Sequence, residues 1–191
     1  MARNTACGSP EERPGQDARG AVGRSCPANP PRRSAPEEAI RQADQLKASG
    51  LITPLVDVIP AVILILNPRR QVLYLNALAR TVTGDKRVED YLGLRVGEVF
   101  DCVHAVESVE GCGSASYCQH CGLNFSLESP ERDNAPPFEC QIMRRGFTET
   151  MDLRVFTTHL TVGEELYIIC VGIDIGAEVC HRALERIFFH D

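Results

Sequence analysis

Residues 60–79, PAVILILNPRRQVLYLNALA, hold two short apolar runs separated by a polar turn. The first run is rich in β-branched residues and ends at Leu66, and the second covers Val72 to Leu75. Two such runs joined by a turn predict a β-hairpin. Asn76 follows where a helix N-cap is wanted, since its side chain can accept a hydrogen bond from the first helical turn. The stretch therefore predicts two strands and then a helix.

Three further strands are predicted in the second half of the chain. Apolar and polar residues alternate over residues 138–142 and again over 151–155, and residues 166–171 form a continuous apolar run. Alternation of this kind indicates a strand with one buried face. Between the two groups of strands, residues 77–130 have scattered Gly and no long period, so short helices and loops are expected there.

The flanks of this core differ from it in composition. Residues 1–35 combine Pro, Gly, Ser and Arg with few aliphatic side chains, which predicts a disordered leader. Residues 36–50 open with Pro and two Glu and close with Lys and Gly, which are start and stop signals of one helix. We therefore expect one folded domain, over residues 51–175, between this helix and a C-terminal helix over 176–191.

This order of two strands, short helices, three strands and an exit helix resembles the PAS family over residues 55–175. The segments LYLNALARTVTG (73–84) and YLGLRVGEVF (91–100) are similar to those after the second PAS strand and before the long connecting helix. The usual Asp and Gly of the first PAS turn are replaced by Asn67 and Arg70. The resemblance implies an α/β fold of the α+β type, with a five-stranded antiparallel sheet, short helices on one face, and a sensory role.

The bulk composition argues against several classes of protein. The chain has 191 residues, 43% of them hydrophobic, and a net charge of -6, while residues 1–35 are net basic. An acidic folded part argues against nucleic acid as a partner, because phosphate binding needs a clustered basic surface. No apolar run reaches the ~18 residues that span a bilayer, and no secretory signal is recognisable. We therefore expect a cytoplasmic protein with no membrane or nucleic-acid partner.

The densest chemical signal lies in DCVHAVESVEGCGSASYCQHCG, residues 101–122. It holds four of the nine Cys in the pattern C-x9-C-x5-C-x2-C, and in a cytosolic chain such cysteines indicate metal ligands or redox sensors. The C-x2-C knuckle followed by Gly122 lets two thiolates reach one ion while Gly relieves the backbone. We predict a metal site with the ligands Cys102, Cys112, Cys118 and Cys121.

The spacing leaves the metal open between Zn and an iron–sulfur cluster, since both accept four thiolates. His104 is an alternative ligand in place of Cys102, or else a hydrogen-bond donor to a ligand. Haem bound through His104 or His120 is a further alternative, as are ordinary buried cysteines or two reversible disulfides. The other cysteines of the folded part, expected in the core or on a helix seam, are Cys140, Cys170 and Cys180.

Residues 176–191 predict a helix with an apolar seam. Its members recur at spacings of three, four and three residues, as in a coiled coil. This seam predicts a homodimer in which two copies of the helix pair, and the alternative is a terminal helix packed on the sheet. The seam consists of Ala177, Cys180, Leu184 and Ile187.

The last ten residues, RALERIFFHD, resemble the opening of the phospho-acceptor box of sensor histidine kinases. The resemblance makes His190 the phosphorylated residue and Asp191 the adjacent acid, which would fix the imidazole tautomer and accept its proton. No ATP-binding domain follows, so we expect that the chain itself is not an enzyme. It is expected to be the leading part of a histidine kinase, or a truncated product, with a response regulator as the partner of the parent kinase.

Together these patterns predict the sensory module of a two-component histidine kinase that responds to redox state or oxygen through its cysteine site. Two alternatives stay open. One is a structural interaction module with a passive zinc knuckle that binds a partner through its sheet. The other is an enzyme that uses a thiolate such as Cys118 as a nucleophile.

Overall fold

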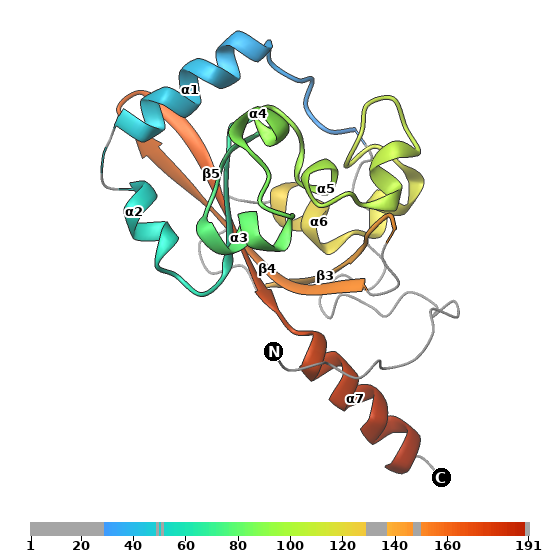
Figure 1. Ribbon diagram of the computed structural model, residues 1–191. Coiled ribbons are helices and arrows are strands. Elements are labelled where there is room, and N and C mark those ends of the chain that lie inside the picture. Colours follow the sequence, from blue (N-terminus) through green and yellow to red (C-terminus); the bar gives the residue numbers. More distant parts are fainter. Residues whose placement is uncertain (1–28, 49, 51, 129–136, 147–149, 190–191) are drawn as a thin grey trace.

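The computed structural model describes residues 29–48, 50, 52–128, 137–146 and 150–189. A hairpin, a series of short helices, three strands and a terminal helix follow one another as predicted (Figure 1). The elements are α1 (Pro36–Ala48), α2 (Ile52–Asp57), β1 (Val62–Leu66), β2 (Val72–Leu75), α3 (Ala77–Val82), α4 (Val88–Tyr91), α5 (Val96–Val99), the 3-10 helices η1 (Val103–Val106) and η2 (Ser116–His120), α6 (Gly122–Glu128), β3 (Phe138–Met143), β4 (Thr150–Val162), β5 (Glu165–Asp174) and α7 (Gly176–Phe189).

The five strands form one antiparallel sheet in the order β2-β1-β5-β4-β3. β1 pairs with β2 and β5, and β4 joins β5 to β3 at the edge of the sheet. The register places Leu64 of β1 opposite Cys170 of β5, and Cys140 of β3 opposite Leu153 of β4. The predicted α+β fold with a five-stranded antiparallel sheet is confirmed.

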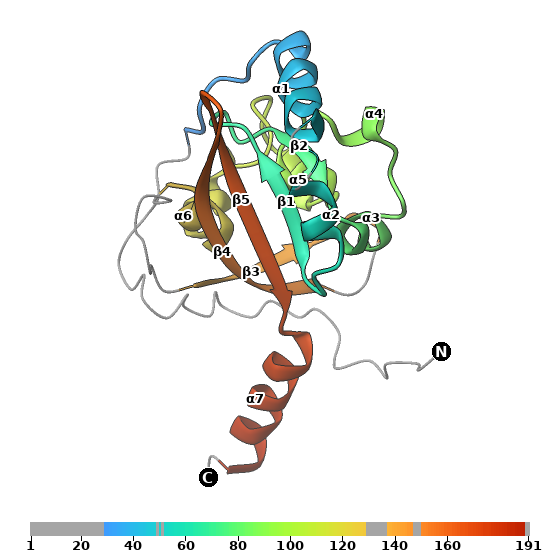
Figure 2. The same ribbon diagram turned by 90° about the vertical axis from the view of Figure 1, so that its left-hand side faces the viewer.

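β1 is apolar throughout because both faces of the sheet are covered at this strand. Val62 and Leu64 face a core shared with α3 to α6, whereas Ile63 and Ile65 face a second core formed with α1 and α2. Successive strand residues point to opposite faces, so each core receives every second side chain. Figure 2 shows α6 and α2 on opposite sides of the sheet. The short helices α3 to α6 thus pack on one face, as predicted, and α1 and α2 pack on the other.

Asn76 confirms the predicted helix start and does more than cap it. Its Oδ1 accepts hydrogen bonds from the backbone N–H of Ala79 in α3 and of Ile63 in β1, each at 3.0 Å. Its Nδ2 donates to the carbonyl of Val56 at 3.1 Å. One buried amide side chain therefore joins α2, β1 and α3.

Two elements differ from the sequence prediction. The short helix α2 was not expected, and β4 continues to Val162, beyond the residues 151–155 in which the sequence alternates. Beyond Val155, β4 and β5 form a long ribbon paired as far as Val162 and Glu165. Side chains on this ribbon are mostly half-buried or exposed, so the sequence there lacks the clean alternation that marks a strand.

Residues 29–35 belong to the predicted disordered leader, yet they are bonded to the folded domain. Arg33 forms an ion pair with Glu98, and the hydroxyl of Ser34 donates to Oε1 of Gln71 at 2.6 Å. The leader prediction was wrong for this short stretch, because polar bonds rather than apolar contacts hold it in place. Residues 1–28 lie outside the described residues.

α7 leaves the end of β5 and extends away from the body of the domain (Figures 1 and 2). An ion pair between Glu139 of β3 and Arg182 ties it to the sheet. Leu184 and Ile187 of the predicted seam are 45% and 72% exposed, so they do not pack on the sheet. Within the described residues, no helix is long and apolar enough to cross a membrane.

Candidate functional site

Five cysteines from separate segments gather between the short helices and β3. Cys102 lies just before η1, Cys112 in the loop after it, Cys118 within η2, and Cys121 just before α6. Cys140 is on β3 and was expected to be an ordinary core residue; it is buried. The five thiols, called the cysteine cluster below, are close enough for charge on one to affect others. The structure therefore brings the four predicted ligands into one region and adds a fifth cysteine.

Gly97 of α5 allows two of these cysteines to approach each other. A Cβ atom at this position would lie 2.6 Å from Sγ of Cys112 and 3.4 Å from Cβ of Cys102. The Cys102 N–H also donates to the Gly97 carbonyl at 2.7 Å. Since real Cβ atoms essentially never lie within 3.0 Å of another heavy atom, the present position of Cys112 against α5 requires glycine at position 97.

Cys121 and Cys140 are in direct contact, with their Sγ atoms 3.6 Å apart. Next to them, a Cβ atom at Gly122 would lie 2.1 Å from the carbonyl oxygen of Glu139. The prediction that Gly122 relieves the knuckle is thus refined, because glycine is needed here for the close approach of α6 to β3. This approach holds the knuckle against the strand.

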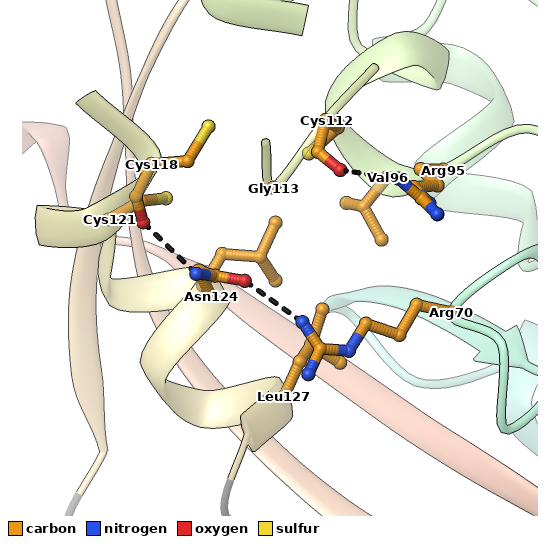
Figure 3. Close-up of a pocket in the computed structure, with 10 residues that line it drawn as sticks. Arg70, Arg95, Val96, Cys112, Gly113, Cys118, Cys121, Asn124 and Leu127 are labelled. Carbon is orange, nitrogen blue, oxygen red and sulfur yellow. Dashed lines mark hydrogen bonds between the residues drawn. The ribbon is translucent and has the colours of Figure 1, made fainter. Parts of the chain in front are cut away.

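A cavity of about 20 Å³ opens between the cysteines. Cys112 lies on one side, and Cys118 and Cys121 lie on the opposite side (Figure 3). A space of this size is enough for one water molecule or a single metal ion. Haem is far larger, and His120, one of its two predicted ligands, is exposed on the surface. The other residues around the cavity are Arg70, Arg95, Val96, Gly113, Leu123, Asn124 and Leu127.

The donors of the cluster are near one another but do not converge on one point. Among the described residues, no group of three His, Cys, Asp or Glu side chains has the arrangement of a metal-ion site. The donor chemistry fits a soft metal, because several thiols surround a small cavity. Binding by the predicted set would require the loop that carries Cys112 and Cys118 to move towards Cys121.

Burial controls the protonation of most of the cluster. It raises the pKa of the thiols of Cys102, Cys112 and Cys118, so these groups are neutral at pH 7. Cys121 differs, because the hydrogen bond with Cys140 lowers its pKa, and the same bond raises the pKa of Cys140. A bound metal would displace the protons, since only thiolates coordinate.

Backbone N–H groups are directed at all five of these sulfur atoms, from Gly97 to Cys112 and from Leu123 to Cys140 among them. Hydrogen bonds of this kind favour the thiolate form and counteract part of the cost of burial. Each of the other three sulfurs receives two of them from its own loop or the helix that follows. The donors are His104 and Ala105 for Cys102, Gly113 and Ala115 for Cys118, and Leu123 and Asn124 for Cys121.

His104 is fixed at the edge of the cluster. Its Nδ1 lies 2.6 Å from Oε1 of Glu107, and its ring stacks on Tyr117 with 4.0 Å between ring centroids. Its Nε2 is buried without a hydrogen-bond partner. A histidine oriented by a carboxylate, with the other nitrogen available, is the usual arrangement of a metal-binding histidine. His104 therefore stays an alternative ligand.

Two buried arginines were missed by the sequence prediction. Nη1 of Arg95 donates to the carbonyls of Glu110 and Cys112 at 2.6 and 3.2 Å, and its Nε has no partner. Arg70 donates to Oδ1 of Asn124 at 3.0 Å. Both guanidinium groups line the cavity, where Arg95 favours negative charge on Cys112 and Arg70 is ion-paired with Glu128. The sequence did mark the position of Arg70, because this arginine replaces the usual Gly of the turn. In the structure Arg70 adopts the left-handed backbone conformation that favours glycine, with φ 63°.

The remaining predicted site residues cannot be placed. His190 and Asp191, the predicted phospho-acceptor pair, lie outside the described residues, so the kinase assignment stays a prediction.

No family model and no curated protein matches the sequence. The similar solved structures include the PAS domain of an HTR-like protein from Haloarcula marismortui, with 18% identity and a TM-score of 0.46, covering 71% of this chain and 98% of that chain. A PAS domain from a two-component sensor histidine kinase has 15% identity and a TM-score of 0.43, covering 69% and 98%. The PAS domain of nitrogen regulation protein NR(II) from Vibrio parahaemolyticus has 14% identity and a TM-score of 0.42, covering 65% and 98%. These likenesses concern the fold alone.

Proposed function

We propose that the chain is a signal-sensing module of the PAS type, with the cysteine cluster as its sensing site and α7 as its output element. The position of β3 carries the proposal. Cys140 contacts Cys121, and its neighbour Glu139 is ion-paired with Arg182 of α7. Because neighbouring strand residues point to opposite faces, one strand joins the cluster to the output helix.

The proposed signal is redox state or oxygen, received through a metal held by the cluster. Zn and an iron–sulfur cluster both suit thiolate donors, and the predicted ligands are the four cysteines of residues 102–121, with His104 as the alternative to Cys102. The N–H donors and the buried Arg95 support this proposal, because both favour thiolates. An iron–sulfur cluster, when bound, would supply the response to oxygen or redox state.

The proposed output follows from the ties between β3 and α7. A change in packing at the cluster would shift β3 and bias the position of α7. In a parent histidine kinase this bias would alter the presentation of His190, and a response regulator would receive the phosphoryl group. Two copies would pair through the seam of α7. In this proposal the chain senses and relays, and phosphoryl transfer belongs to the ATP-binding domain of the parent.

Anaerobic purification of the chain, followed by metal analysis and absorption spectra before and after exposure to air, tests the proposal. Iron with sulfide and a visible band that bleaches in air is the expected result. Stoichiometric zinc with no visible band and no response to oxygen would replace the sensing role with a passive structural site. A chain without metal would overturn the metal-based function.

A matched pair of variants separates the cluster from general effects of cysteine loss. Cys112→Ala is expected to abolish metal retention. Cys170→Ala removes another buried cysteine, on β5, and is expected to retain the metal. Equal retention in both variants would show that the predicted ligands do not hold the metal.

A further inference from the structure

The distance between the Sγ atoms of Cys121 and Cys140 is close to that between two cysteine ligands of one metal ion. Their Sγ atoms are 3.6 Å apart, too far for a disulfide and close for two buried side chains. With a metal–sulfur distance of about 2.3 Å, two thiolates on one tetrahedral ion lie about 3.8 Å apart. The pair therefore already has nearly the separation of two ligands on the same metal ion.

The surroundings of the pair hold both sulfurs in this relation. The backbone N–H of Leu123 hydrogen-bonds to both Cys121 and Cys140. The tight packing of Gly122 on Glu139 fixes the two segments against each other. Both thiols are thus positioned by backbone.

Five cysteines compete for the four positions of a tetrahedral site, and the cavity distinguishes between them. Cys112, Cys118 and Cys121 line it, and neither Cys102 nor Cys140 does. Cys140 is nevertheless in direct sulfur contact with the lining cysteine Cys121.

We propose that Cys140 is a metal ligand that shares one tetrahedral ion with Cys121, and that Cys118 and Cys112 complete the set in place of Cys102. This inference rests on the proposed function, since it specifies the ligands of the same site. The ion is a soft divalent metal such as Zn²⁺ or Fe²⁺. Cys121 and Cys140 are the assembled half of the site, and the loop with Cys112 and Cys118 closes on the ion.

Closure requires the loop to release its present bonds, because the carbonyl of Cys112 accepts a hydrogen bond from Arg95 and its N–H donates to Glu98, each at 3.2 Å. Cys112 is flanked by Gly111 and Gly113, both with positive φ, at 80° and 97°. The buried Arg95 beside the cavity would offset part of the negative charge of four thiolates on a divalent ion. A site of this kind also links the metal directly to the sheet, because Cys140 is part of β3.

Anaerobic titration of the reduced full chain with Co²⁺ tests the proposal. Sulfur-to-cobalt charge-transfer absorption increases with the number of bound thiolates, and visible d–d bands mark tetrahedral geometry. We expect Cys140→Ala to lose about a quarter of the charge-transfer intensity and to bind Co²⁺ at least about tenfold more weakly, as expected for a lost ligand. Cys170→Ala, a matched change of another buried cysteine on β5, is expected to keep the wild-type spectrum.

Cys102→Ala provides the reciprocal measurement and does not disturb the core at β3. A wild-type spectrum for Cys102→Ala supports the proposal, even if Cys140→Ala does not fold. Loss of a thiolate in Cys102→Ala with no change in Cys140→Ala would overturn it and restore the set predicted from the sequence, leaving the proposed function intact. A wild-type chain that binds neither its native metal nor Co²⁺ would instead remove the proposed function.

Discussion

Both carboxylate oxygens of Glu139 accept hydrogen bonds from Nη2 of Arg182, at 3.2 and 3.3 Å. Glu139 belongs to β3 and Arg182 to α7, so this contact crosses from the sheet to the terminal helix. Arg154 of β4 lies 3.5 Å from the same carboxylate and 2.8 Å from that of Glu178 in α7. The four side chains form one charged network at the base of α7.

Removing the charge of Glu139 should loosen α7 without unfolding the domain. The pair is partly exposed, so we expect Glu139→Gln to lower the free energy of unfolding by less than about 1 kcal/mol. Backbone amides of residues 176–189 should exchange faster with solvent, as measured by hydrogen exchange and mass spectrometry. Glu185→Gln is the control, because Glu185 pairs with His181 of the same helix. Equal exchange in both variants would show that the network does not hold α7.

A methyl group at position 122 should separate α6 from β3. Its Cβ would lie 2.1 Å from the carbonyl oxygen of Glu139, which belongs to backbone and cannot move aside alone. We expect Gly122→Ala to lower the free energy of unfolding by about 1–3 kcal/mol in urea denaturation. Gly176→Ala, at the start of α7, is the control. The new Cβ atom would meet only the carboxylate of Asp174, at 3.2 Å, so the free energy of unfolding should change far less. A variant as stable as wild type would argue against the close approach.

The buried thiol of Cys170 should make stability depend on alkaline pH. Burial raises the pKa of Cys170 to about 12, whereas the thiol of the unfolded chain has its ordinary value near 9. The folded chain therefore keeps the proton longer, so this stabilising contribution is complete below about pH 9 and is lost as pH rises towards 12. We expect unfolding free energies, from urea denaturation at several pH values, to fall less steeply in Cys170→Ala than in wild type. Identical slopes would contradict burial of this thiol.

The exposed seam of α7 should decide the association of the chain. Ile187 is 72% exposed, and a glutamate there would place charge in the middle of a paired seam. If two copies pair through α7, the wild-type chain sediments as a dimer and Ile187→Glu as a monomer. Glu185→Gln, beside the seam, should leave the dimer unchanged. A wild-type chain that stays monomeric over the concentration range would rule out this interface.

The sequence was most informative where a local pattern determines the structure. The hairpin around residues 60–75 and the cap at Asn76 are correct, because alternation, turn residues and capping act over a few positions. The part of β4 beyond Val155 carries no alternation in the sequence, since its place in the sheet depends on pairing with β5.

The site was predicted in part for the same reason. The four cysteines of residues 102–121 fall within one short segment, so their spacing was visible. Cys140 is 19 residues from Cys121 in the chain, and only the packing of α6 on β3 brings their sulfurs together. No pattern in the sequence marked Arg95, which is 2% exposed and bonded to loop carbonyls. Contacts of this kind follow from the tertiary structure.

α1 covers one face of the sheet and therefore limits how far the N-terminus can be truncated. Ala39, Ala43 and Leu46 pack against Ile63 and Ile65 on the outer face of β1. A shortened version that begins at residue 50 would uncover these isoleucines and create an apolar patch prone to self-association. It would also remove Pro31, whose carbonyl accepts a hydrogen bond from Arg95 at 2.7 Å, and Arg33, the partner of Glu98. Protein engineers who trim the N-terminus to improve expression should keep every residue from position 29 onwards.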